Sequence, residues 1–572
     1  MFFTESNNGC VNEKREMRLE AFLVLQLLLG FGLSNACFLI GFSLHAWHFW
    51  ASFAAVIGLA FRHSRRAGLW MIGLNLLMLV LTFYTFTYVH VDASICHLPI
   101  SHFLEDGWNP VTESSVEAIR ARFADRGLNE INDFPVYHII AAPKFSQILA
   151  AQMQSAFGLF SAGGYALWFM CFTLAIVAYR FSSSVFRAER WISSVFAALV
   201  CSNTIIAEAC FWGLVDYAAY SAIAISAMSL RMWLESKSRI DLYMFFACVV
   251  IAVATKMNTL ACVLLLLVTA AILGRKEKDM RSGLLIFAAS LAFFCVIPYW
   301  ASAWRYGSPF YPAHSFRADV PTVDLTNDFV GNDDANRMGY IARMVYAWIS
   351  RPLAVWGCKN WYSLDGFDPQ WRWAFLSSGL GWMFSLMLWS GAVLSLFINR
   401  NRTTLVAWAL MLAFLFVPVK YIGYSRYANF TFFVIAVLWF NIGSAMPARM
   451  RYVAAFVVAV FACNRVYECG SLFMRQVRGE GIRQRNISQI ATSRDYCFEK
   501  PLENWEYVVK NRLLLDGASC SSNGTDAVEI SWPLVFSGPR LVERDESVRW
   551  SKVDGFPSPV WSRLRFKEGG GR

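Results

Sequence analysis

Long apolar stretches recur along most of the chain, and they predict membrane-spanning helices. The core of a bilayer needs roughly 20 apolar residues per helix. We interpret the first run as an anchor, because it is too long for the core of a cleavable signal peptide. The pattern predicts an all-α polytopic membrane protein with about 13 spans, centred in 20–44, 47–61, 69–89, 163–180, 191–207, 214–231, 241–255, 257–274, 283–301, 374–397, 404–419, 427–443 and 451–463.

The positions of Lys and Arg orient these spans. Alternate short connections carry two to four basic residues each, whereas the intervening hairpins hold only Lys256, Lys420 and Arg426. This distribution follows the positive-inside rule and predicts an N-terminus in the cytosol. It leaves three long segments on the outer face, at about 90–162, about 302–373 and from 464 onward.

We therefore divide the chain into three parts. These are a cytosolic N-terminus (1–19), a transmembrane domain (20–463) and an outer-face C-terminal tail or small cap (464–572). Disulfides are permitted on an outer face. Five cysteines fall on this face, and free thiols are an equal alternative to pairing. Cys497 with Cys520 is the first pair to test.

Composition agrees with membrane residence. Apolar residues make up 57% of the chain and charged residues only 16%, whereas a soluble domain has about 25% charged residues. The net charge of +11 is largely the orientation signal, so we predict no nucleic-acid partner. The 14 cysteines form no CxxC pair, and we predict no essential metal.

Polar residues gather where the third span meets the outer face. His90, Asp92 and His97 lie within eight residues directly after this span. An acidic side chain so close to the membrane is energetically costly, and it usually faces protein or a water-filled cavity. A carboxylate at the lip of a pocket would have a raised pKa suited to a general base. A solvated loop start is the alternative reading.

The same block resembles the first outer loop of GT-C-fold membrane glycosyltransferases, in particular bacterial protein-mannosyltransferase-like members. The residues DASICHLP at 92–99 continue into SHFLEDG. The family loop reads Asp, three residues, Tyr, His-Leu-Pro and Arg, then an aromatic-rich helix that ends in Gly. The match is gap-free at Asp92, His97, Leu98, Pro99 and Gly107, and it departs at Cys96 and Ile100, where the family has Tyr and Arg.

Three further landmarks resemble the same family in order along the chain. They are the turn RYGSPFYP from Arg305 to Pro312, the hairpin TKMN around Lys256, and the hairpin KYIGYSRY from Lys420 to Tyr427. The resemblance covers roughly residues 70–440 as separate landmarks. The tail has no counterpart in it.

The resemblance implies a GT-C-like helical bundle whose two long outer loops carry interfacial helices. It implies transfer of a sugar from a polyprenyl-phosphate donor to a glycan, lipid or protein acceptor on the periplasmic side of a bacterial inner membrane. The lipid-linked sugar is a co-substrate, and no cofactor is expected. Asp92 is the expected base of an inverting reaction. The expected donor-phosphate residues are Lys256, Arg305, Lys420 and Arg426, and the expected substrate-binding residues are His97, Glu208, Asp216 and Tyr311.

Two amphipathic segments are expected to form helices that cover the site. Polar residues at helical spacing in 144–154 predict an interfacial helix lying on the membrane, and 337–356 has a similar pattern. Polar positions in the first segment are Lys144, Gln147, Gln152 and Gln154.

Three other functions remain open. A transporter or flippase would place ionisable residues at the midplane and show inverted repeats, whereas charges here lie at the ends of spans. A glycan polymerase or ligase of related fold would use an oligosaccharide pyrophosphate donor. An inactive relative is the third alternative, because Cys96 and Ile100 break the motif. No Walker glycine loop, nucleophile elbow or HExxH motif occurs in the chain.

Overall fold

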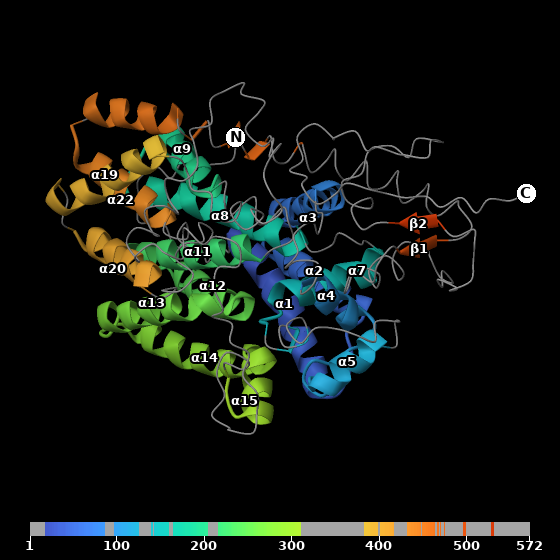
Figure 1. Cartoon of the computed structure of the whole chain (residues 1–572). Coiled ribbons are helices and arrows are strands. Elements are labelled where there is room, and N and C mark those ends of the chain that lie inside the picture. Colours follow the sequence, from blue (N-terminus) through green and yellow to red (C-terminus); the bar gives the residue numbers. More distant parts are fainter. Residues whose placement is uncertain are drawn as a thin grey trace, which may run out of the picture.

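The chain folds into a helical bundle, seen in a computed structural model. The structure describes residues 18–85, 97–124, 142–158, 164–203, 215–309, 382–398, 401–416, 432–447 and 449–460, with short pieces besides. Figure 1 shows α8, α11, α12 and α13 running side by side, with α4, α5 and α7 gathered at one end of the bundle.

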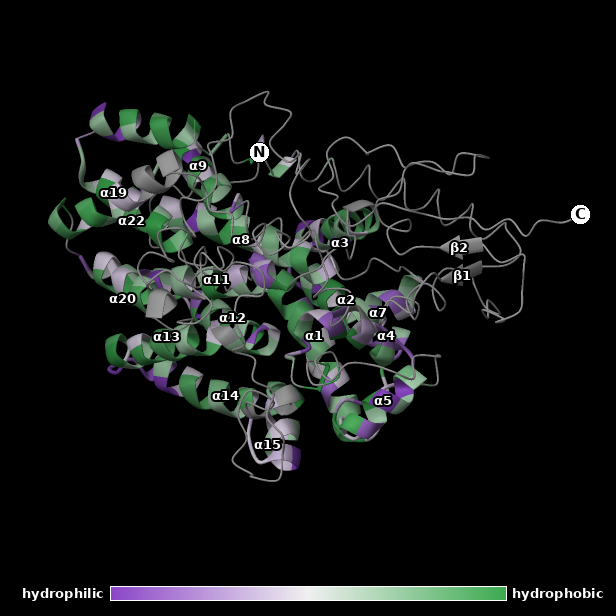
Figure 2. Cartoon of the chain, in the orientation of Figure 1, coloured by the Kyte–Doolittle hydropathy of each residue, from purple (hydrophilic) through white to green (hydrophobic). Residues whose placement is uncertain are grey.

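Each of the predicted spans overlaps a helix. These helices are α1 (Leu19–Leu39), α2 (Ala46–His63), α3 (Arg65–Thr85), α8 (Gly164–Val185), α9 (Arg190–Cys201), α11 (Asp216–Ser236), α12 (Arg239–Thr255), α13 (Leu260–Leu273), α14 (Lys278–Phe294), α19 (Trp382–Ile398), α20 (Arg402–Phe416) and α22 (Phe432–Ala445), followed by helical residues 449–460. Figure 2 shows hydrophobic residues along most of their length.

Three stretches among the described residues are long and apolar enough to cross a membrane on their own. They are Leu19–Leu39, Arg65–Phe83 and Gly164–Val185. Shorter apolar helices accompany them, including α9, α13 and α22. The chain is thus an integral membrane protein, and the total of 13 spans stays a prediction.

The outer loops and the tail add shorter elements. The first loop forms α4 (Leu98–Glu105), α5 (Val116–Ala124) and α7 (Phe145–Phe157), and α14 is followed by a helical turn, η3 (Val296–Trp300), and α15 (Ala301–Tyr306). Strands β1 (Tyr496–Phe498) and β2 (Val528–Ile530) pair in parallel, with Tyr496 opposite Val528. This strand pair departs from the predicted all-α class. Cys497 lies in β1, whereas its expected partner Cys520 lies outside the described residues.

Helix α11 lies at the centre of the bundle and is buried around its whole circumference, against α8 on one side and α12 on the other. Its small residues Ala218, Ala219, Ala222 and Ala224 are fully buried. Small side chains let helix backbones approach closely, which is how helices pack where lipid offers no hydrophobic driving force.

Buried charges join three helices at one end of the bundle. The Asp241 carboxylate, at the start of α12, accepts two hydrogen bonds. One comes from Arg18, which precedes α1, at 2.8 Å, and the other from Arg180 of α8, at 3.1 Å. Arg180 also pairs with Glu20 of α1. The side chains of both acids are 2% exposed. The contacts place the start of α1, the last turns of α8 and the start of α12 at one end, as the predicted alternation of spans requires.

Removing Arg180 should destabilise the fold strongly. The Arg180→Met variant leaves two buried carboxylates short of positive charge, and breaking a buried pair costs about 3–5 kcal/mol. We expect a large drop in the thermal unfolding temperature of the detergent-purified protein.

The matched control is Arg239→Gln. Arg239 pairs with Asp279 at the same end, but these side chains are 71% and 46% exposed, so the pair contributes little. Equal losses of stability in the two variants would contradict a cluster that holds the helices together.

Candidate functional site

The His-Leu-Pro motif forms the start of α4. Pro99 lies in the first turn of the helix, where its fixed φ suits the helix and its missing N–H costs nothing. Gly107 follows the helix at φ +86°, a left-handed conformation that only glycine adopts without strain. His97 is the residue before the helix, and its Nδ1 lies 2.6 Å from the Gln147 amide nitrogen. The motif is thereby tied to α7.

Helix α7 is buried instead of lying on the membrane surface. Its polar residues Gln147, Gln152 and Gln154 are at most 3% exposed, and the helix contacts α1, α2, α4, α8 and α12. The prediction of a helix at 144–154 is confirmed, but the prediction of an interfacial position is wrong. Periodicity revealed a polar face without revealing that protein covers it.

Gln152 shows what this polar face does. Its amide donates to the Gly30 carbonyl at 2.7 Å and to the Ser34 hydroxyl at 2.8 Å, both on α1. A side chain at Gly30 would place its Cβ 2.9 Å from Gln152 Oε1. The glycine therefore allows the close approach that makes these hydrogen bonds.

Lys144 precedes α7 and is fully buried. Its ammonium donates to the carbonyls of Ile140 at 3.0 Å and Ala142 at 2.9 Å, and it lies 5.6 Å from the centre of the Trp108 ring. Burial lowers the pKa of this ammonium to about 7, because desolvation disfavours its charged form. Lys144 closes the turn before α7 and does not present a solvated charge.

A neutral polar triangle joins three spans beneath this region. The Gln26 amide contacts the Asn75 side-chain oxygen at 2.7 Å and the Tyr165 hydroxyl at 2.8 Å, and Tyr165 donates to Asn75 at 2.9 Å. Polar side chains inside a bilayer bind one another across helices. The triangle fixes α1, α3 and α8 relative to one another.

Asp216 and Lys256 form a buried ion pair. Asp216 lies in the first turn of α11, and Lys256 follows the last residue of α12. The Lys256 ammonium lies 2.5 Å from Asp216 Oδ1, and the side chain of Lys256 is 16% exposed and that of Asp216 2%. The sequence assigned these residues separately, to substrate binding and to donor phosphate. The structure brings them together.

Arg305 ties the two outer loops to each other. Its guanidinium, on α15, donates to the carbonyls of Val111 and Thr112, both at 2.7 Å, and the neighbouring Tyr306 hydroxyl donates to the Ser114 carbonyl at 2.8 Å. The expected role of Arg305 in binding a donor phosphate stays a prediction.

Several expected residues lie outside the described part of the chain. They are Asp92, Glu208, Tyr311, Lys420 and Arg426, together with the segment 337–356. Ile100, one of the two departures from the resemblance, is fully buried. Within the described ranges, no group of three or more His, Cys, Asp or Glu is placed to hold a metal ion. The lack of an essential metal stays a prediction.

The contact between Gln147 and His97 could not be predicted from the sequence. Helical spacing identifies Gln147 as a polar position on a helix, but it does not identify the partner of that side chain. The signal was a run of polar residues in an otherwise apolar segment, at Lys144, Gln147, Gln152 and Gln154. Such residues need partners wherever water is excluded.

The Asp216–Lys256 pair should respond differently to single and double substitution. Lys256→Gln leaves the Asp216 carboxylate buried without the ammonium beside it, a loss of about 3–5 kcal/mol. Adding Asp216→Asn removes the buried charge, so the double variant should recover much of the thermal stability lost by the single one. A double variant less stable than Lys256→Gln would contradict the pairing.

Comparison with known proteins gives one structural likeness to report. No protein-family model matches the chain. No curated protein matches it in sequence. The chain resembles a solved structure described as the crystal structure of ArnT from Cupriavidus metallidurans bound to undecaprenyl phosphate, with 13% sequence identity, 77% of this chain and 84% of that chain covered, and a TM-score of 0.42.

Proposed function

We propose that this protein is an integral membrane glycosyltransferase. It transfers a sugar from a polyprenyl-phosphate donor to a glycan, lipid or protein acceptor on the periplasmic face of a bacterial inner membrane. The observation that carries the proposal is the motif from Asp92 to Pro99 at the entrance to α4, whose His97 is held against Gln147 of the buried helix α7.

Asp92 is the proposed base. Its carboxylate takes the proton of the acceptor hydroxyl, and the acceptor oxygen attacks the anomeric carbon of the sugar. The bond from that carbon to the phosphate oxygen breaks on the opposite face, and the polyprenyl phosphate leaves with the electron pair. The configuration at the anomeric carbon inverts. A positioned base of this kind contributes about 10²–10⁴-fold to a rate.

The leaving phosphate needs a cation, since negative charge develops on it. Lys256 is a candidate because it follows a membrane helix at the predicted outer end, where positive residues are scarce. The buried Asp216 carboxylate beside it holds the ammonium in place. Arg305, Lys420 and Arg426 are further candidates for this role.

The proposed substrate contacts come from different parts of the outer end. His97 is held at the start of α4, while Glu208 and Tyr311 belong to the outer hairpin and to the second outer loop. We assign these residues, with Asp216, to the sugar and the acceptor. No cofactor is needed, because the lipid-linked sugar supplies both the group transferred and the leaving group.

The placement of charge favours an enzyme over a transporter. Described ionisable residues near the ends of helices include Glu20, Asp241 and Arg180 at one end and Asp216 and Lys256 at the other. A transporter would be expected to place ion sites near the midplane. The contacts described above, from Gln26, Asn75 and Tyr165, are neutral.

Replacing Asp92 should abolish transfer while leaving the protein folded. The Asp92→Asn variant keeps the side-chain volume and loses the base, so we expect a loss of about 10²–10⁴-fold in turnover with unchanged expression. The assay is release of polyprenyl phosphate from the lipid-linked sugar by purified protein in the presence of acceptor.

The matched control is Asp106→Asn, the same change at the residue that follows α4. It should retain activity. Full turnover by Asp92→Asn would refute Asp92 as the base, and equal losses in both variants would point to damage of the loop instead of loss of the base.

A further inference from the structure

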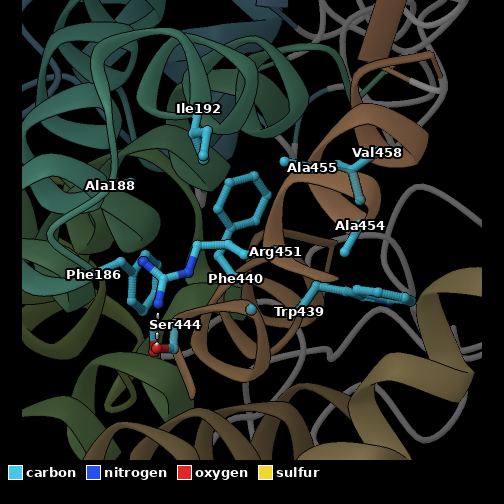
Figure 3. Close-up of a pocket in the computed structure, with 11 residues that line it drawn as sticks. Phe186, Ala188, Ile192, Trp439, Phe440, Ser444, Arg451, Ala454, Ala455 and Val458 are labelled. Carbon is cyan, nitrogen blue, oxygen red and sulfur yellow. Dashed lines mark hydrogen bonds between the residues drawn. The ribbon is translucent and has the colours of Figure 1, made fainter. Parts of the chain in front are cut away.

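A pocket opens between helices at the end of the bundle that holds the buried ion cluster. Its walls come from the connection after α8, from α9, from α22 and from helical residues 449–460. Figure 3 shows the lining side chains, with Arg451 extending across the pocket toward Ser444. This end is the one that the positive-inside pattern assigns to the cytosolic leaflet.

The walls of the pocket are almost entirely apolar. Phe440 packs edge-on against Phe196 at 4.7 Å between ring centres and lies 6.3 Å from Phe186. Phe440 and Phe186 line the pocket. Ile192, Ala455 and Val458 complete the lining. Small side chains on the last helix leave space that larger side chains at the same positions would fill. A hydrocarbon chain suits such a space.

Arg451 is the charged residue that lines this pocket. One guanidinium nitrogen donates to the carbonyls of Ser444 at 3.2 Å and Met446 at 3.3 Å. Its Nε is buried and has no hydrogen-bond partner. Among the described residues, no carboxylate lies within ion-pair distance of Arg451. A guanidinium that lines an apolar pocket favours a phosphate or carboxylate oxygen as its partner.

Two helices that line this pocket begin close to each other. Helix α9 starts at Arg190, and the last helix starts near Arg449. The Trp191 and Tyr452 rings stack at 6.3 Å, which places the two starts side by side. The amino ends of helices favour anions.

The acid closest in sequence, Glu189, is already engaged. Its carboxylate accepts from the Tyr452 hydroxyl and from the Trp191 indole at 3.1 Å. These donors are neutral, so the carboxylate keeps its negative charge, but the basic residues Arg190, Arg449 and Arg451 outnumber it at this end. The pocket combines an apolar lining with the guanidinium of Arg451.

We propose that this pocket binds an anionic glycerophospholipid of the cytosolic leaflet, with an acyl chain in the cavity and the phosphate on Arg451. Basic pockets between membrane helices on the cytosolic side bind such headgroups. The bilayer itself presents acyl chains to an apolar opening between helices. The proposal rests on membrane residence and is independent of the proposed glycosyltransferase activity.

Native mass spectrometry of the detergent-purified full chain tests the site. The protein is titrated with phosphatidylglycerol and, separately, with phosphatidylcholine of the same acyl chains. We expect wild type to retain phosphatidylglycerol preferentially, and Arg451→Gln to lower that binding about fivefold, as expected for the loss of one basic contact.

Arg449→Gln is the matched control, because Arg449 is an exposed arginine two residues away on the same helix. It should leave lipid binding near the wild-type level. A second variant, Ala455→Phe, fills the cavity and retains Arg451, and it should weaken binding of both lipids. Thermal unfolding confirms that each variant is folded.

Three results would overturn the proposal. The first is equal retention of the two lipids by wild type. The second is equal loss of phosphatidylglycerol in Arg451→Gln and Arg449→Gln. The third is undiminished lipid binding in a folded Ala455→Phe protein, which would show that the cavity holds no acyl chain.

Discussion

The bundle depends on one constraint, which is that polar groups removed from water must find partners inside the protein. At one end, Arg18 and Arg180 surround the buried carboxylates of Glu20 and Asp241. At the other end, Lys256 neutralises Asp216. Between them, the contacts described from Gln26, Asn75 and Tyr165 are neutral. In the part of the chain that the structure describes, these buried ion pairs thus lie near the ends of helices, where they fix how the helices meet.

Helix α7 connects this scaffold to the candidate chemistry. One of its glutamines, Gln152, binds the backbone of α1, and another, Gln147, contacts His97 at the start of α4. The proposed base, Asp92, therefore lies six residues before the first residue of a helix that is braced against the membrane domain. Arg305 holds the start of the second outer loop to the first. Bracing of this kind suits a site that must hold a lipid-linked donor and an acceptor in fixed relation.

The sequence predicted the elements well, because apolar run length and basic connections are local properties. The predicted spans overlap helices, and the antiparallel order of α1, α8 and α12 agrees with the alternation inferred from Lys and Arg. Pairings between distant positions were not predictable. Asp216 and Lys256 are 40 positions apart, and each looked like a separate ligand. Helix α7 looked interfacial because periodicity reports a polar face, not what covers it. For the same reason, the sequence did not reveal that Arg451 lines an otherwise apolar pocket.

The central claim is that the protein forms a covalent bond between a sugar and an acceptor. The most direct test is mass spectrometry of envelope glycans, glycolipids and glycoproteins from cells with and without this protein. We predict that cells lacking it have lost one hexose, pentose or amino sugar from a specific acceptor and have accumulated the unconsumed polyprenyl-phosphate sugar. The claim would be contradicted if all glycans, glycolipids and glycoproteins kept their covalent structures and lipid-linked glycans changed only in the leaflet that they occupy. That result would indicate a transporter.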